Sequence, residues 1–82
     1  MEQQIQVGVE RMNRGNWLKI FIPYSTAAVM TANLQNDHGE TLRSVRLASG
    51  NNFIDIESMT KTRVRVKVDT PFETLLLELN LD

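Results

Sequence analysis

The chain has 82 residues, enough for one hydrophobic core and too few for two, so we expect residues 1–82 to form a single domain. Hydrophobic residues make up 41% of the sequence, which suits a globular core, and the absence of cysteine excludes disulfides, thiolate nucleophiles and cysteine-based zinc sites. The formal net charge of -1 attracts neither nucleic acid nor an anionic membrane, so neither is expected as a partner.

The first half of the chain has apolar side chains at every second position, which predicts strands rather than helices. Strands are expected over Ile5–Val9, Trp17–Ile22 and Val29–Leu34. Asn and Gly tolerate a positive φ, so Asn13–Asn16 predicts one turn and Asn36–Gly39 predicts a hairpin turn.

The next two strands are less regular. Thr41–Leu47 is expected to be a strand, but its apolar residues break strict alternation, which indicates a β-bulge near Arg43 and Ser44. Ser49–Asn52 predicts a turn, and Phe53–Glu57 a short strand with Ile54 and Ile56 facing inward.

The clearest strand signal lies at Arg63–Asp69, where valines alternate with charged residues. Thr70 and Pro71 then form a turn. The last segment, Thr74–Leu81, also alternates and favours a strand, although its good helix formers leave a helix as the alternative.

Seven short strands separated by turn signals are typical of a small sandwich. We therefore predict an all-β fold, a small seven-stranded antiparallel β-sandwich of the immunoglobulin-like kind. Its expected core consists of Leu18, Ile20, Leu34, Leu47, Ile54, Ile56, Val64 and Val66.

No group of residues predicts catalysis. His38 is the single histidine and lies in a turn beside Asp37, so a solvated turn residue is the favoured interpretation over an acid–base or metal role. Asp37 and Glu40 lack the dense oxygen ligands of a calcium loop. We expect no enzyme activity, no cofactor and no metal.

Two groups of residues are candidates for partner binding. Trp17 and Phe21 share one face of a strand whose other face is also apolar, so they are expected to be covered by a loop or a second copy, or exposed as a protein contact or sugar platform. Arg63, Arg65 and Lys67 form a charged stripe, interpreted as a solvated face or as a docking surface for an acidic partner.

The stretch from Val29 to Val68 resembles a known family in the spacing of its residues. Gly39 follows a strand, Leu47 ends the next one, and the run Gly50-x-Asn52-x-Ile54-x-Ile56 precedes an alternating strand. This pattern is similar to the C-terminal sorting domain of the type IX secretion system (Por secretion) at the ends of many exported Bacteroidetes proteins. Asn36 stands where that family usually has Asp. The resemblance implies a β-sandwich with a role in protein sorting.

Location in the cell depends on this resemblance. A secreted or cell-surface protein is expected if it holds, and a cytoplasmic one if the chain is complete as given. Met1–Gln4 has no basic start followed by an apolar stretch of roughly 7 to 15 residues, so no signal peptide is visible. No run approaches the ~20 apolar residues that span a bilayer, and no membrane insertion is expected.

The sequence thus predicts a non-catalytic module that works by docking to a protein partner or by self-association. A small carbohydrate-binding module that uses exposed aromatic residues, Trp17 and Phe21 above all, is the alternative.

Overall fold

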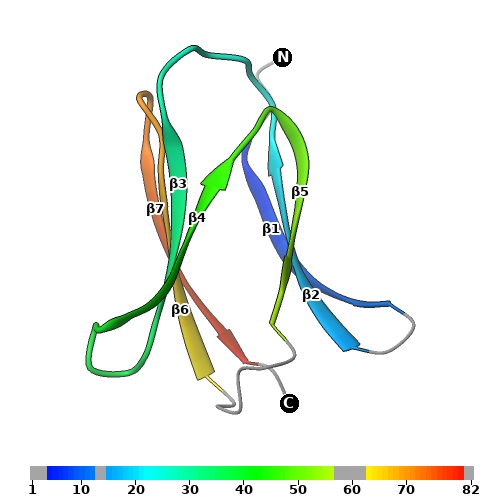
Figure 1. The fold of residues 1–82 in the computed structure, drawn as a ribbon, viewed down its shortest axis with the longest axis vertical. Coiled ribbons are helices and arrows are strands. Elements are labelled where there is room, and N and C mark those ends of the chain that lie inside the picture. The colour runs from blue at the N-terminus through cyan, green and yellow to red at the C-terminus, as the bar shows by residue number, and fades with distance from the viewer. Residues whose placement is uncertain (1–3, 13–14, 57–62, 81–82) are drawn as a thin grey trace. The chain divides into compact units, whose positions relative to one another are not determined.

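The computed structural model describes residues 4–12, 15–56 and 63–80. Within these ranges the chain forms strands and no helix, so the all-β prediction is confirmed (Figure 1). The strands are β1 (Gln6–Met12), β2 (Gly15–Ile22), β3 (Met30–Gln35), β4 (Thr41–Leu47), β5 (Gly50–Asp55), β6 (Arg63–Asp69) and β7 (Thr74–Asn80).

The chain divides into two compact units, and each holds one sheet. Met1–Thr26 and Ala48–Thr60 contain a three-stranded sheet in the order β1-β2-β5. Ala27–Leu47 and Lys61–Asp82 contain a four-stranded sheet in the order β4-β3-β6-β7. All neighbouring strands are antiparallel, as predicted, and two such sheets are the components of a small β-sandwich. That residues 1–82 form one domain stays a prediction.

Each sheet buries one face, because alternate side chains of a strand point to opposite sides. In the three-stranded sheet Ile54 lies opposite Leu18, and both are buried. In the four-stranded sheet Val66 lies opposite Leu34, and both are fully buried. All eight predicted core residues are buried, and the buried set further includes Ile22, Met30, Ala32 and Val68.

Several details differ from the sequence prediction. The first strand extends to Met12, and β2 begins at Gly15, so Gly15 and Asn16 of the predicted turn are strand residues that pair with Met12 and Arg11. The strand expected from Phe53 begins at Gly50, because Asn51 and Asn52 already pair with Phe21 and Ile20 of β2. The bulge in β4 is present, but the register shift leaves Leu42 as the extra residue, since Leu34 pairs with Arg43 and Gln35 pairs with Thr41.

The last segment is a strand and not a helix. Thr74–Asn80 pairs with β6 in an uninterrupted register, from Thr74 opposite Asp69 to Asn80 opposite Arg63. Parts of three predicted elements lie outside the described residues: Asn13 and Arg14 of the first turn, Glu57 at the end of its strand, and Leu81 at the end of the last one.

Candidate functional site

Trp17 and Phe21 are both half-buried and lie on the side of the three-stranded sheet opposite to its buried core residues. They belong to β2 and point away from the buried Leu18 and Ile20. The strand register places further side chains on the same side, because residues paired across strands share a face. This aromatic face comprises Gln6, Gly8, Glu10, Trp17, Lys19, Phe21, Asn51, Phe53 and Asp55.

The register arranges the aromatic face in rows across the three strands. Trp17 lies between Glu10 and Asp55, so an acidic residue is its partner on each neighbouring strand. Phe21 lies between Gln6 and Asn51, so amide side chains flank the second ring. Each ring is thus bordered by hydrogen-bonding groups, an arrangement that suits a ligand with both apolar and polar parts.

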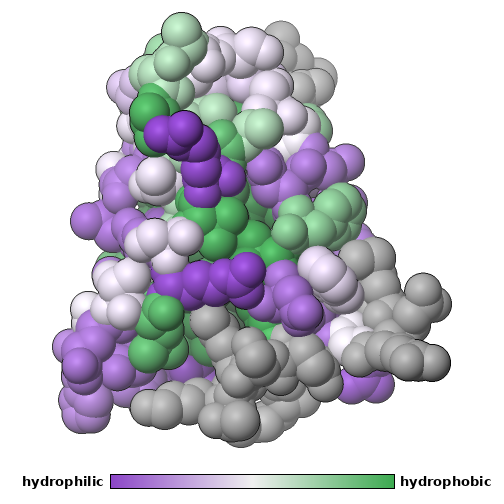
Figure 2. All heavy atoms as spheres, in the orientation of Figure 1, coloured by the Kyte–Doolittle hydropathy of each residue, from purple (hydrophilic) through white to green (hydrophobic). Residues whose placement is uncertain are grey.

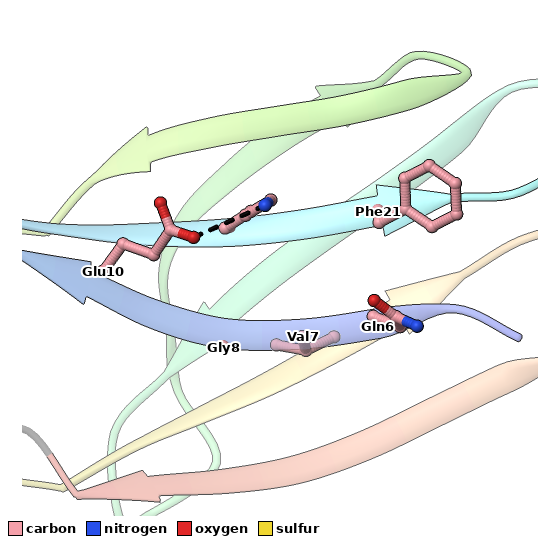
Figure 3. Close-up of a pocket in the computed structure, with 6 residues that line it drawn as sticks. Gln6, Val7, Gly8, Glu10 and Phe21 are labelled. Atoms are coloured by element: carbon pink, nitrogen blue, oxygen red, sulfur yellow. Dashed lines mark hydrogen bonds and ion pairs between the residues drawn. The ribbon is translucent and has the colours of Figure 1, made fainter.

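A hollow of about 210 Å³ lies on the aromatic face beside Phe21. Gly8 occupies its middle, and a Cβ built on Gly8 would have no atom within 4 Å. At one end the Lys19 Nζ lies 3.4 Å from Glu10 Oε1, and at the other the Phe21 ring stands beside Gln6 (Figure 3). The missing side chain of Gly8 therefore opens a depression with an ion pair at one end and a ring at the other.

Phe53 belongs to the same face, and the sequence interpretation missed it. Its side chain is 46% exposed, and it lies opposite Lys19. Alternate side chains of a strand point to opposite faces, so an outward orientation of Phe53 could have been predicted from the inward orientation of Ile54 and Ile56. Its position beside β2 could not, because about thirty residues separate the two strands in sequence.

Arg63, Arg65 and Lys67 lie together on β6, on the side of the four-stranded sheet opposite to the buried valines. This cationic stripe is partly neutralised, since Arg63 Nε lies 3.1 Å from Glu78 Oε1, with both side chains about half exposed. An exposed pair of this kind contributes only ~0.2–1 kcal/mol. The cationic stripe belongs to the four-stranded sheet and the aromatic face to the three-stranded sheet, so the two surfaces lie in different units.

His38 lies in the turn between β3 and β4 and is exposed. The turn is organised by the buried Asn36, whose Oδ1 accepts hydrogen bonds from the backbone N–H groups of His38 and Glu40 at 2.9 and 3.0 Å. Over the described ranges, no group of three or more His, Cys, Asp or Glu side chains is placed to hold a metal ion. These ranges also include no helix long and apolar enough to cross a membrane.

No family model matches the chain, and comparison with curated proteins and with solved structures gave no match. The resemblance to the type IX sorting domain therefore stays a prediction. The residues that carry it have clear structural roles: Leu47, Ile54 and Ile56 are buried, and Gly39 and Gly50 adopt positive φ angles of 80° and 89°.

Large hydrophobic side chains also remain exposed elsewhere. Figure 2 shows the hydropathy of the residues and marks polar residues over much of the face drawn there. Single exposed apolar residues are ordinary, and only those that share a face or an edge suggest a contact. The exposed large hydrophobic residues are Val9, Val29, Leu42, Phe53, Phe72 and Leu76.

Proposed function

We propose that this chain is a non-catalytic binding module that docks to a protein partner through its aromatic face. The observation that carries the proposal is the gathering of the half-buried Trp17 and Phe21 and the exposed Phe53 on one face of a sheet. Aromatic residues supply much of the binding energy of protein interfaces, because a rigid ring buries a large area at a small entropic cost.

The chemistry of the aromatic face indicates the kind of partner. Glu10 and Asp55 border Trp17, and Lys19 forms an ion pair with Glu10, so the charged groups of the face sum to a small excess of negative charge. A cation placed over a Trp ring contributes about 0.5–1 kcal/mol at an exposed site. The face therefore suits a protein surface that presents Arg or Lys together with apolar side chains.

Selection from a displayed peptide library tests this proposal. We expect the selected peptides to be enriched in Arg, Lys and apolar residues, and to lose most of their affinity for the Trp17→Ala and Phe21→Ala variants. Phe72→Ala is the matched control, because Phe72 is 64% exposed and lies in the other unit. Peptides that bind Trp17→Ala as tightly as the natural chain would refute the aromatic face as the docking surface.

A carbohydrate is the second candidate ligand, favoured by the hollow beside Phe21. A sugar ring can stack on an aromatic side chain while its hydroxyl groups bond to polar neighbours. Gln6, Glu10 and Lys19 supply such neighbours around the hollow. Binding on a glycan array that Phe21→Ala or Gly8→Ala abolishes would support this candidate. Gly8→Ala adds a methyl group inside the hollow, so it should affect a bound sugar more than a protein that covers the whole face.

The sorting role implied by the family resemblance is part of the proposal. It is supported by the motif residues: Gly50 and Asn52 lie at the start of β5, where Asn52 Nδ2 is 3.2 Å from the Gly50 carbonyl oxygen, and Ile54 and Ile56 are buried. A fluorescent reporter joined to the N-terminus of this chain should be exported by a host with a type IX system. Retention of a folded reporter inside such cells would separate the binding module from any sorting role.

A further inference from the structure

The strand β7 forms an open edge of the four-stranded sheet. Over the described residues β6 is the one strand that pairs with it, and their register runs without a break from Thr74 to Asn80. An open edge presents backbone N–H and C=O groups that can template another strand.

The outward-pointing groups can be assigned from the hairpin turn. Thr70 donates its backbone N–H to the carbonyl of Glu73 at 3.0 Å, so these two residues form a hydrogen-bonded pair. Hydrogen-bonded and non-hydrogen-bonded pairs alternate along antiparallel strands. Leu75, Leu77 and Leu79 therefore direct their backbone groups toward β6. The residues whose backbone groups point away from it are Thr74, Leu76, Glu78 and Asn80.

The other sheet edges carry features that oppose strand addition. The edge strand β1 contains Gly8, Glu10 and Arg11, and β4 contains Arg43, Arg46 and a bulge. In β5 the Asn52 side chain bonds to both the N–H and the carbonyl of Ala48, just before the strand begins. Charges, bulges and side-chain coverage are the usual protection of an edge. The sequence of β7 has no Gly, Pro, Lys or Arg, and Glu78 is its one charged residue.

The side chains of β7 also remain partly uncovered. Leu75, Leu77 and Leu79 are only half-buried, whereas Val64, Val66 and Val68 on the neighbouring strand are buried. On the opposite side of the strand Leu76 is 63% exposed. An additional strand beside β7 would therefore cover apolar surface on both faces of the sheet.

We propose that β7 pairs with β7 of a second copy, antiparallel and with the two-fold axis at Leu77. This inference goes beyond the docking function proposed above, because β7 and the aromatic face belong to different units. In this register all residues from Thr74 to Asn80 are paired, Leu76 lies opposite Glu78 of the other copy, and the outward-pointing backbone groups meet one another. The result is one continuous eight-stranded sheet with an isologous interface.

The sequence of β7 allows two copies to pair along the full strand in one register without opposing like charges. The two-fold register at Leu77 keeps the two Glu78 carboxylates out of direct opposition, while an axis at Glu78 would place them face to face. An axis at Leu76 leaves Leu79 and Asn80 without partners in the other β7. The chain's net charge of -1 adds little repulsion between copies.

Sedimentation across a concentration series, from about 1 µM to about 1 mM, tests the pairing. The natural chain should pass from monomer to dimer within this range. Leu76→Glu places a carboxylate opposite Glu78 in both halves of the interface and should weaken dimerisation roughly tenfold or more. Leu76→Lys is the matched control. It places opposite charges there and should dimerise at least as tightly as the natural chain.

The two variants separate association from folding. Within one chain residue 76 lies opposite Lys67, so Leu76→Glu gains an opposite charge there and Leu76→Lys gains a like charge. A defect caused by poor folding would therefore affect Leu76→Lys more, which is the reverse of the order expected for dimerisation. Adding Glu78→Lys to Leu76→Glu restores opposite charges across the interface and should restore the dimer.

A natural chain that stays monomeric throughout the series would overturn the proposal. So would a dimer that both Leu76 variants leave unchanged, or assembly into species larger than a dimer. Trp17→Ala should leave the dimer intact, and Leu76→Glu should leave peptide binding at the aromatic face intact. Failure of the β7 pairing is thus distinguishable from failure of the docking function.

Discussion

The side chain of Asn52 contacts backbone groups of β2, of β5 and of Ala48, which precedes β5. Its Oδ1 accepts a hydrogen bond from the N–H of Ala48 at 2.8 Å. Its Nδ2 lies within hydrogen-bond distance of the carbonyl oxygens of Ala48, Gly50 and Ile20, at 2.8, 3.2 and 3.2 Å. One amide thus closes the turn before β5 and ties that turn to β2.

Replacing Asn52 by Ala should lower the free energy of unfolding by roughly 1–3 kcal/mol, because the partners of its amide lose their hydrogen bonds. Urea unfolding measures this change. Asn51→Ala is the control: its side chain is exposed and points to the other side of the strand, so a change within about 0.5 kcal/mol is expected. Equal effects of the two substitutions would contradict the structural role of Asn52.

A second residue-scale prediction concerns Ile56, which is 3% exposed and donates its backbone N–H to the Asn16 carbonyl at 3.2 Å. Ile56→Ala should cost ~2–5 kcal/mol, because it removes buried methyl and methylene groups and leaves a cavity. Val29→Ala, at a site 59% exposed, serves as the surface control. A loss below about half a kilocalorie for Ile56→Ala would mean that this side chain is not buried in solution.

At the scale of the elements, Gly50 and Gly8 have different structural roles that the sequence alone does not distinguish. Gly50 starts β5 with a φ of 89°, a conformation that L side chains rarely adopt. Gly8 lies inside β1 with open space around its missing side chain and without a positive φ.

Gly50→Ala should therefore destabilise the chain by about 1–2 kcal/mol, because Cβ is strained in the left-handed region. Gly8→Ala should be neutral or stabilising by up to about 1 kcal/mol, since alanine restricts the unfolded chain and meets no atom in the folded one. Thermal unfolding of both variants checks the contrast. A larger loss for Gly8→Ala than for Gly50→Ala would reverse the assignment.

The strands could be predicted from alternation, since period-two patterning records which face of a strand is buried. Arg63–Asp69 is predicted with its observed bounds for this reason. The start of β5 could not be, because Gly50–Asn52 has the composition of a turn and becomes strand by pairing with β2. The bulge lies at Leu42, one residue before the predicted position at Arg43, because the pairing with the partner strand sets its place.

The candidate site was predictable only in part. Alternation places Trp17 and Phe21 on one face, and Arg63, Arg65 and Lys67 on another. The flanking carboxylates, Phe53 and the hollow at Gly8 depend on which strands lie beside β2, and pairing between distant strands is not encoded in local periodicity. In β7, likewise, tertiary pairing outweighs the helix propensity of a Leu- and Glu-rich segment.

At the scale of the whole molecule, the chain crosses repeatedly between its two units. The first unit combines Met1–Thr26 with Ala48–Thr60, and the second combines Ala27–Leu47 with Lys61–Asp82. Each unit contains roughly forty residues, a size below which a chain usually needs disulfides, metals or oligomerisation to fold alone. Cysteine is absent from the sequence, so no disulfide stabilises either unit.

We therefore predict that the two units unfold in one cooperative transition, as the single domain expected from the sequence would. Ile56→Ala in the first unit and Val66→Ala in the second should each shift the same midpoint, whichever probe is used. Fluorescence of Trp17 reports on the first unit alone, and far-UV circular dichroism reports on the strands of both. The two signals should coincide during urea unfolding of the natural chain and of each variant. If Val66→Ala moved the dichroism transition and left the Trp17 transition in place, each sheet would have its own stability, and the 82 residues would be two folding units instead of one.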